Sequence, residues 1–440
     1  MNHQFQSPVT KKIKSGDSRI ILKPYYLLKQ YYHSVYQNIF KYNKSSKNKL
    51  LVIRTPKNKI GLDIVEELKI NHGWEIYFAS WSSERLKEVR KLNYFNINLN
   101  FLESTDKRKS LIFHKSRILE RFKLINFQRV TKNLNNFFQS NIDEPIIEIL
   151  VYYFSKACSL IDTYEYLNKI VNPDILILLN ENILSERVAS LYSNTTNLKS
   201  VLIQHGIFMG NTYRSFSTDF SLVWGKISKE LLIKKGYHSD RIIEIGYPSI
   251  SNNVEENINE NENYLDSVLF LGQNADDLYL LEKKYKKILI ILEKAIKSLP
   301  NMKFILRPHP SQKPGYYSNM IKSKHSNLII DRQKTLNDSF KNARVIITIF
   351  STAAIEAMKY GIPIITLDTD ANNSFSPFLN FSKKAKDSKS LIESLNLLFY
   401  NIDERNIFIK KSKNFYHHFV NQDILSPVSY GANTINEIIK

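Results

Sequence analysis

The sequence predicts an α/β fold built from two doubly wound parallel sheets. Short apolar runs of strand length alternate with amphipathic helical segments along most of the chain, and this alternation is typical of parallel βαβ units. The length of 440 residues exceeds what one core usually fills, so we expect two domains. Hydrophobic residues make up 43% of the chain, which supports packed cores and excludes a wholly disordered protein.

The first set of expected elements begins at Leu50. Its members are a strand at 50–54, a helix at 60–70, strands at 74–80 and 173–179, a loop and helix at 180–193, and a strand at 198–204. Residues 100–170 are rich in polar and aromatic residues and are expected to be mostly helical. Their pattern does not define individual elements.

A second set begins near Asp219, and an Asn- and Glu-rich segment at 251–264 within it is expected to be a loop or linker. Its members are strands at 219–225, 241–248, 267–273, 303–308, 344–349 and 362–367, and helices at 226–237, 278–299, 352–360, 390–400 and 433–440. The expected parts of the chain are an N-terminal extension at 1–49, domains at 50–215 and 216–420, and a C-terminal helix at 421–440 that packs back on the first domain.

The composition restricts the partners and the compartment. A formal net charge of +20 favours an acidic partner such as a nucleotide, an anionic glycan, a lipid headgroup or a nucleic acid, with general solubility as the alternative. Cys158 is the sole cysteine, which excludes an internal disulfide and favours a reducing compartment. The chain has neither an apolar run of about 18 residues nor a secretory signal, so we expect a cytoplasmic protein.

The N-terminal extension is strongly basic. It contains ten lysines and arginines against one acid, Asp17, and an aromatic-rich stretch at 24–40 lies between the charges. This pattern suits an interfacial helix on an anionic membrane, which would place the protein on the inner face of that membrane. The alternative is a helix that packs on its own domain and turns a basic face to solvent.

Polar loops follow four of the expected strands. In open parallel sheets ligands bind at the carboxyl ends of the strands, so these loops are the first places to search for a site. They are 204–206, 272–274, 307–310 and 350–352. Gly272, Gln273 and Asn274 are therefore expected to contact the ligand.

The strongest motif is the strand-to-helix junction at 346–365. Ser351 and Thr352 open the expected helix, and backbone N–H groups at its start, together with two hydroxyls, would hold a phosphate. Glu356 lies one turn further on, where its carboxylate can accept hydrogen bonds from ribose hydroxyls or a base. The alternative is an ordinary Ser/Thr cap followed by an acidic residue in the first turn.

A second motif is the Arg-Pro-His-Pro turn at 307–310. Pro308 and Pro310 restrict the backbone on both sides of His309. Arg307 suits a phosphate, and a fixed imidazole can give a proton to a departing phosphate oxygen near neutral pH. The alternative is a surface turn whose histidine has no chemical role.

Candidates for the base that deprotonates an acceptor hydroxyl follow two strands of the first set. Glu181 is the first candidate, and His205 is a second candidate for a base or a ligand contact. The alternative for His205 is a histidine satisfied at a domain boundary.

No metal or dedicated cofactor is expected. Asp368 and Asp370 have the D-x-D spacing that can hold a divalent ion with a diphosphate, but an exposed loop explains so short a match equally well. The sequence has no clustered His/Cys set for zinc, no G-x-x-x-x-G-K-[ST] loop and no G-x-G-x-x-G fingerprint.

Taken together, these motifs resemble those of bacterial GT-B-fold glycosyltransferases that build capsules and lipopolysaccharide. The resemblance covers roughly residues 170–370 and includes Leu-Ile-Gln-His-Gly at 202–206 and the segment 219–248. It is greatest to transferases that use CMP-activated acidic sugars of the sialyl and Kdo type, because those enzymes carry similar R/K-P-H-P and S-[ST]-x-x-x-E-A motifs.

The resemblance implies two Rossmann-like doubly wound domains that face each other across a cleft. It implies that His309, Ser351 and Thr352 contact the nucleotide phosphate, with Glu356 nearby. The implied reaction moves a sugar from a nucleotide-sugar donor to an acceptor hydroxyl of a surface polysaccharide, which would be an anionic or lipid-linked glycan, without a metal.

Other functions are compatible with the same motifs. A polyol-phosphate transferase of teichoic-acid type, a UDP-sugar transferase and a UDP-sugar 2-epimerase are alternatives on the same fold, which does not choose between them. A nucleic-acid-binding protein would explain the charge, but the sequence holds no recognisable nucleic-acid module, so no nucleic acid is expected.

Overall fold

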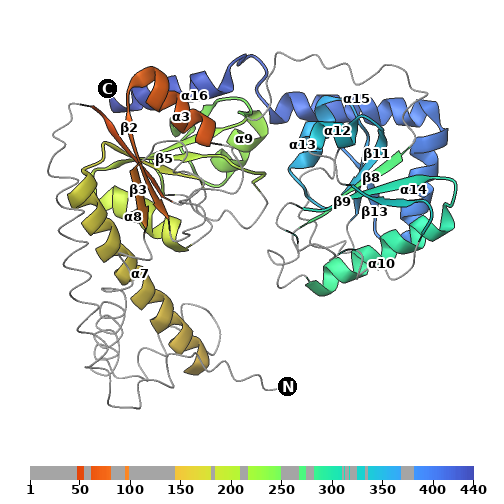
Figure 1. Ribbon diagram of the computed structural model, residues 1–440, viewed down its shortest axis with the longest axis horizontal. Coiled ribbons are helices and arrows are strands. Elements are labelled where there is room, and N and C mark those ends of the chain that lie inside the picture. The colour runs from red at the N-terminus through yellow and green to blue at the C-terminus, as the bar shows by residue number, and fades with distance from the viewer. Residues whose placement is uncertain are drawn as a thin grey trace. The chain divides into compact units, whose positions relative to one another are not determined.

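The computed structural model describes residues 47–53, 61–80, 95–98, 144–179, 184–208, 217–248, 267–273, 282–309, 312, 317, 325–331, 335–367 and 381–440. The expected membrane-facing part of the N-terminal extension lies outside these residues, as do Glu181, Asn274, Asp368 and Asp370. Figure 1 shows helices beside each of two sheets.

The first sheet has seven strands in the order β3-β2-β1-β4-β5-β6-β7. Its strands are β1 (Lys49–Ile53), β2 (Glu75–Ser80), β3 (Phe95–Asn98), β4 (Ile175–Leu178), β5 (Lys199–Ile203), β6 (Phe220–Val223) and β7 (Ile242–Glu244). The pairs β1–β2, β1–β4, β2–β3 and β4–β5 are parallel. Its central strand β4 is buried along its whole length, as expected for a parallel strand covered on both faces.

Helices accompany the first sheet and continue the strand–helix alternation. They are α3 (Leu62–His72), α7 (Glu144–Val171), α8 (Leu184–Thr196), α9 (Lys226–Lys234) and the short 3-10 helix η1 (Ser239–Arg241). Gly236, two residues beyond α9, has a φ of 97°, a left-handed conformation that glycine adopts readily after a helix.

The second sheet has six strands in the order β10-β9-β8-β11-β12-β13, and its pairs are parallel. The strands are β8 (Ser267–Leu271), β9 (Lys303–Arg307), β10 (Leu328–Ile330), β11 (Ala343–Thr348), β12 (Ile364–Leu367) and β13 (Lys383–Ala385). Its helices are α10 (Glu282–Ser298), α12 (Leu336–Phe340), α13 (Ala353–Lys359), α14 (Ser388–Tyr400) and α15 (Ile402–Phe419).

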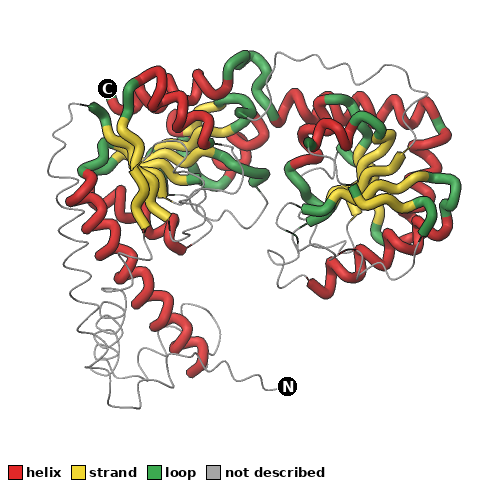
Figure 2. The backbone as a smooth tube through the Cα atoms, in the orientation of Figure 1, coloured by secondary structure: helices red, strands yellow, loops and turns green. Residues whose placement is uncertain are grey.

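The core of the second sheet joins α10, α14 and the strands between them. Phe270 on β8, Phe304 on β9 and Leu292 on α10 are almost completely buried in one cluster. Figure 2 shows the strands of this sheet as a twisted layer flanked by helices. Both sheets therefore have the α/β construction that the alternation predicts.

One part of the strand assignment differs from expectation. The strands at 219–225 and 241–248 were expected to open the second set, but β6 and β7 extend the first sheet instead. The Gln204 amide donates to the Leu222 carbonyl at 2.9 Å, and the Ile245 amide donates to the Val223 carbonyl at 2.7 Å. The second sheet begins only at Ser267, after the Asn- and Glu-rich segment.

By its internal contacts the chain forms two compact units. The first contains Met1–Ile203, Phe216–Ser221 and Ala432–Lys440, and the second contains Gln204–Ser215 and Leu222–Gly431. The domain boundaries expected from the sequence stay a prediction.

The last helix, α16, covers Pro427–Ile439, so it lies within the C-terminal segment expected at 421–440 and starts earlier than the helix expected at 433–440. Two hydrogen bonds join its end to other parts of the first unit. The Trp74 indole Nε1–H donates to Asn436 Oδ1 at 3.1 Å, and the Lys199 ammonium donates to the Ile438 carbonyl. Within the described part of the chain, no helix is long and apolar enough to cross a membrane.

Candidate functional site

Three neighbouring strands bring the predicted loops of the second sheet to one edge. β8 lies between β9 and β11, and all three run parallel. Leu271 pairs in register with Arg307, and Phe270 pairs with Ile347. Adjacent strands lie about 4.8 Å apart, so the loops after these strands emerge side by side at the carboxyl edge.

Arg307 ends β9 in a network of charged and polar side chains. Its Nη1 donates to Asp331 Oδ2 at 2.9 Å and to Ser339 Oγ at 2.6 Å, and the Ser339 hydroxyl also donates to Asp331 Oδ2. The Arg307 side chain is 20% exposed, whereas that of Asp331 is 3% exposed. Charge-assisted bonds of this kind are stronger than neutral ones, so one end of the guanidinium is firmly held.

Glu356 lies in α13 at the same edge. The Tyr247 hydroxyl donates to Glu356 Oε1 at 2.9 Å, and both residues belong to the second compact unit. Burial raises the pKa of the Glu356 carboxyl, while the hydrogen bond from Tyr247 and the positive charge of Arg307 oppose that rise. The positive charge of Arg307 therefore acts on Glu356 as well as on Asp331.

Tyr416 of α15 adds a buried hydroxyl beside Glu356. It is 3% exposed, and its Oη has no hydrogen-bond partner within the described residues. Burial raises the pKa of this phenol, and the neighbouring Tyr360 and Glu356 raise it further. Glu356 thus accepts a hydrogen bond from Tyr247 and also interacts electrostatically with Tyr416 of α15.

The opening of α13 is more occupied than the sequence suggested. The Ser351 amide donates to Thr348 Oγ1 at 3.0 Å, the Ala353 amide donates to Ser351 Oγ at 3.3 Å, and the Ala354 amide donates to the Ser351 carbonyl at 3.0 Å. Three of the four backbone N–H groups from Ser351 to Ala354 therefore already have acceptors within the protein. Thr352 is the N-cap residue of α13 and makes no side-chain cap hydrogen bond, whereas the Ser351 hydroxyl accepts from the first helical residue.

The loop after β8 is packed closely against its neighbours. The Gly272 amide donates to the Arg307 carbonyl at 2.8 Å, and a Cβ at Gly272 would overlap the Tyr317 hydroxyl oxygen. The Gln273 amide donates to the Tyr285 hydroxyl at 3.0 Å, and the Tyr285 and Tyr317 hydroxyls are 2.7 Å apart. This tyrosine pair fixes the backbone between β8 and the site.

The side chain of Gln273 is buried in the same loop. It is 6% exposed, and its Nε2 has no hydrogen-bond partner within the described residues. A buried amide without an acceptor is costly. Asn274, the third predicted member of this loop, lies outside the described residues.

The loop after β5 reaches the opening of α13. A Cβ at Gly206 would lie 3.7 Å from Thr352 Oγ1, an ordinary van der Waals contact, and both residues belong to the second unit. His205, next to Gly206, is partly buried. The structure thus brings Gly206, the residue after His205, close to Thr352, although the two loops follow strands of different sheets.

Gln204, in the same loop, has a structural role. Its Oε1 accepts from the Trp224 amide at 2.8 Å, its Nε2 donates to the Gly206 carbonyl at 2.9 Å, and the Trp224 indole donates to the Gln204 carbonyl at 3.0 Å. Trp224 in turn packs against Tyr247, with ring centroids 4.2 Å apart. A continuous set of contacts therefore runs from the β5 loop through Trp224 and Tyr247 to Glu356.

His309 lies in the turn after β9 and is partly buried. Its carbonyl accepts from the Gln312 amide at 2.9 Å, which closes a turn over the proline-flanked segment. Since β9 is next to β8 and two strands from β11, His309 emerges at the same edge as Gly272 and Ser351.

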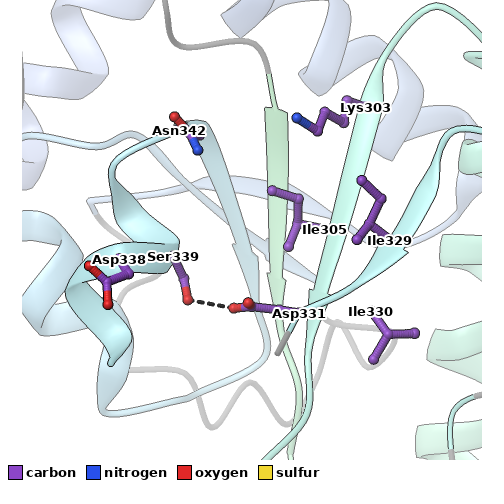
Figure 3. A pocket seen from close by; sticks show the side chains of 8 residues that line it. All are labelled: Lys303, Ile305, Ile329, Ile330, Asp331, Asp338, Ser339 and Asn342. Carbon is purple, nitrogen blue, oxygen red and sulfur yellow. Dashed lines mark hydrogen bonds between the residues drawn. The ribbon is translucent and has the colours of Figure 1, made fainter. Parts of the chain in front are cut away.

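A cavity of about 490 Å³ lies beside this network (Figure 3). Its lining residues are Lys303, Ile305, Ile329, Ile330, Asp331, Asp338, Ser339 and Asn342. It extends along β9 and β10 from Lys303, at the amino end of β9, to Asp331. None of the residues predicted from the sequence lines it, so we place the candidate site at the carboxyl edge and not in the cavity.

Sequence reasoning missed three residues of this arrangement: Tyr247, Asp331 and Ser339. Tyr247 and Asp331 follow strands β7 and β10, so the strand-end rule could have found them. No local signal marks Ser339, which meets Arg307 only through the packing of α12. Among the described residues there is no group of three or more His, Cys, Asp or Glu side chains that could hold a metal ion.

Comparison with known proteins gives a fold. No protein-family model matches the sequence, and no curated protein matches it. Solved structures do match. The UDP-GlcNAc 2-epimerase from Neisseria meningitidis bound to UDP-GlcNAc is 13% identical with a TM-score of 0.53, and the match covers 89% of this chain and 99% of that one.

Two glycosyltransferase structures match over similar lengths. The glycotransferase of kitacinnamycin is 10% identical with a TM-score of 0.55, and the match covers 90% of this chain and 100% of that one. A glycosyltransferase from Rickettsia africae is 14% identical with a TM-score of 0.50, covering 90% and 98%. Identities this low show the fold alone. The chain has the GT-B fold expected from its motifs.

Proposed function

We infer that this protein is a nucleotide-sugar enzyme, and specifically a glycosyltransferase. The observation that carries the inference is that a cationic and an anionic side chain, Arg307 at the end of β9 and Glu356 in the first turn of α13 after β11, lie at the same carboxyl edge of the second sheet, where only β8 separates the two strands. A guanidinium suits a phosphate, and a carboxylate one turn into a helix suits the hydroxyls of a ribose. One edge therefore offers complementary groups for the two polar parts of a nucleotide.

The proposed reaction breaks the bond between the anomeric carbon and the donor phosphate oxygen. The acceptor hydroxyl oxygen forms the new bond to that carbon, and its proton passes to a base, for which Glu181 and His205 are the candidates. Arg307, with Ser351 and Thr352, stabilises the charge that develops on the departing phosphate. His309 gives a proton to the leaving oxygen, and no cofactor or metal takes part.

The donor we favour is a CMP-linked acidic sugar. The support is the pair of motifs around His309 and Ser351, which resembles CMP-sugar transferases. A UDP-sugar donor has comparable support, because one matching structure is an epimerase bound to UDP-GlcNAc. That structure also favours a second candidate function, a UDP-sugar 2-epimerase, in which no acceptor takes part.

The acceptor we propose is an anionic or lipid-linked glycan of a surface polysaccharide. Its support is the net charge of +20, which attracts anionic partners. The basic N-terminal extension would keep the enzyme on the cytoplasmic face of an anionic membrane. Vesicle sedimentation tests this: binding to anionic vesicles should weaken with salt and be lost on deletion of residues 1–48.

Thermal-shift measurements with CMP, CDP, UDP and GDP test the proposed function. A nucleotide that binds the folded state raises the melting temperature, by an amount that grows with the ratio of its concentration to Kd. We expect one of the four to do so and the others to do less. A protein that none of them stabilises would not be a nucleotide-sugar enzyme. Incubation of the matching nucleotide sugar without acceptor, followed by NMR, separates the transferase from the epimerase, because only the latter changes the sugar.

A further inference from the structure

Helix α10 carries an exposed stripe of lysines around an isoleucine. The exposed residues Lys287, Ile290, Lys294 and Lys297 follow one another at intervals of three, four and three positions, which places them on one face of an α-helix. With a rise of about 1.5 Å per residue, this α10 stripe is about 15 Å long. Ile290 is 53% exposed, and Figure 1 shows α10 as an outer helix of the second unit. The α10 stripe is therefore open to a partner.

The opposite face of α10 is already occupied. Ile288, Leu292 and Ile296 are almost completely buried in the core of the second sheet. Because this apolar face is used within the protein, α10 cannot dock into a hydrophobic groove of a partner as an amphipathic target peptide does. Any partner of this helix therefore meets the α10 stripe.

Acidic side chains do not compensate the charge of the α10 stripe. Its three lysines form no ion pair within the described part of the chain. The acid Glu293 lies beside the stripe with its side chain 24% exposed, and its Oε1 is 3.6 Å from His325 Nε2. The exposed face of α14, in contrast, combines Lys389 with Glu393. An uncompensated row of cations attracts an anionic surface.

We propose that the α10 stripe is a docking surface for an anionic lipid bilayer. The long side chains of its three lysines extend beyond the helix and can reach anionic headgroups together. Ile290, at the middle of the stripe, can enter the apolar region beneath those headgroups. A nucleic acid or a free anionic glycan would offer the lysines the same charge but would give the isoleucine no comparable environment, so the bilayer fits both components of the stripe.

This contact belongs to the folded second unit and is separate from the basic N-terminal extension. Because α10 connects β8 to β9 and covers one face of their sheet, a bilayer against the α10 stripe would lie alongside that sheet. The carboxyl edge with the candidate site would then open along the membrane surface, where a lipid-linked acceptor is held. Only this benefit rests on the proposed function, since lipid binding itself needs no nucleotide.

Co-sedimentation of the full chain with vesicles tests the charge of the stripe. Vesicles of phosphatidylglycerol and phosphatidylcholine supply the anionic surface, and pure phosphatidylcholine vesicles are the neutral control. The test variant removes the three lysines of the stripe and is Lys287→Gln/Lys294→Gln/Lys297→Gln. The control variant removes the same charge from exposed positions at β13 and the start of α14 and is Lys384→Gln/Lys386→Gln/Lys389→Gln.

We expect the test variant to lower the partition coefficient on anionic vesicles about 100-fold, because each lysine close to the surface adds to the attraction. The control variant should change it far less, since at about 0.1 M salt charges more than about 10 Å from the membrane are largely screened. Equal losses in the two variants would show that only net charge matters and would overturn the proposal, as would a wild type that does not bind anionic vesicles.

A fluorescent label at position 290 separates the α10 stripe from the N-terminal extension. Ile290→Cys carries a nitrobenzoxadiazole dye in a Cys158→Ser background, because Cys158 is the sole native cysteine. Ile407→Cys is the matched control: Ile407 is 48% exposed on α15, which Figure 1 shows on the far side of the second sheet from α10. We expect anionic vesicles to shift the dye emission to the blue at 290 and not at 407. No shift at 290, or equal shifts at both positions, overturns the proposal.

Ile290→Ser distinguishes a bilayer from a soluble polyanion. We expect this variant to bind anionic vesicles about tenfold more weakly, through the loss of apolar burial, and to be retained on heparin like the wild type. Unchanged vesicle binding would show that the α10 stripe takes anions of any kind and would overturn the bilayer as its partner. None of these assays contains a nucleotide, so a failure of the proposed function would leave their outcome unaffected.

Discussion

The loop after β5 and the loop after β9 both place polar side chains at the carboxyl end of a parallel strand, yet they use them differently. The side-chain amide of Gln204 hydrogen-bonds to the backbone of Trp224 and of Gly206, and Gln204 is 1% exposed. Arg307 commits Nη1 to its neighbours but remains 20% exposed. A strand end therefore marks where a site can form, and the remaining exposure of a charged group marks where a ligand can bind.

Replacing Arg307 should have the largest effect on the rate of sugar transfer. It is the strongest test of the difference between a structural strand-end residue and a ligand-binding one. We expect Arg307→Ala to lower the rate of sugar transfer by about 10²–10³-fold, as for the removal of one preorganised donor to developing charge. Steady-state assays with the matching donor measure the rate. Lys303→Ala, at the amino end of the same strand, is the control and should keep most of the activity. Equal losses of activity in Arg307→Ala and Lys303→Ala would contradict the assignment of the site to the carboxyl end of β9.

Replacing Gln204 probes the structural side of the comparison. Gln204→Ala leaves the buried Trp224 amide and the Gly206 carbonyl without their partners, so we expect the free energy of unfolding to fall by about 1–3 kcal/mol. Urea denaturation followed by tryptophan fluorescence measures this. A variant as stable as the wild type would show that the Gln204 side chain is not the clamp that its hydrogen bonds indicate.

Gly272 combines the structural role and the binding role, because its loop is tightly packed and also lies next to Arg307. The Cβ of Gly272→Ala would lie 2.8 Å from the Arg307 carbonyl oxygen as well as against Tyr317. We expect overpacking to cost about 1–3 kcal/mol in unfolding free energy. Gly73→Ala is not a neutral control because its φ is 70°, whereas Gly206, with a normal φ and a 3.7 Å neighbour, should tolerate alanine. Similar losses at 206 and 272 would contradict the packing argument.

The smallest expected effect concerns the ionisation of Glu356. Because the pKa of Glu356 is raised in the folded protein, its contribution to stability is fully present below the unfolded pKa and is lost as pH rises through the folded pKa. Glu356→Gln removes this dependence. We expect Glu356→Gln to be stabilised relative to the wild type at pH 8, and less so or not at all at pH 4, when unfolding is measured in urea. A difference that is independent of pH would contradict the raised pKa.

Much of the fold follows from the sequence because buried parallel strands are short continuous apolar runs. The segments around Leu50, Ile175 and Ile346 are of this kind, and each forms a central strand. The assignment of β6 and β7 to a sheet could not be predicted in the same way. Which sheet a strand joins depends on hydrogen bonds such as Gln204 to Leu222, and these have no signature in local composition.

The helix α15 was also not predicted. Its sequence is mostly polar and basic, but it buries the aromatic side chains of Phe408, Phe415, Tyr416 and Phe419. Two of these rings pack against residues far along the chain: Phe419 against Trp224, with ring centroids 6.0 Å apart, and Phe415 against Phe381, at 4.6 Å. Such contacts exist only after the chain has folded, so hydrophobic periodicity alone is a weak guide to them.

For the candidate site, the sequence identified the loops and the structure identified how they are held. Arg307, Ser351 and Glu356 were found because each follows a strand or opens a helix. Their partners Asp331 and Tyr247, which follow β10 and β7, are 24 and 109 residues away in sequence. Which side chains from different strands contact each other depends on the tertiary fold. The strand-end rule therefore found the charged residues Arg307 and Glu356 but not the residues that hydrogen-bond to them.

The central claim is that the loops after β8, β9 and β11 form one nucleotide site. Hydrogen–deuterium exchange with and without a saturating nucleotide tests it most directly. The account predicts joint slowing of exchange in peptides that cover 267–273, 303–312 and 343–356, and no change along α14. Protection of only one of these segments, or none despite measured binding, would contradict it.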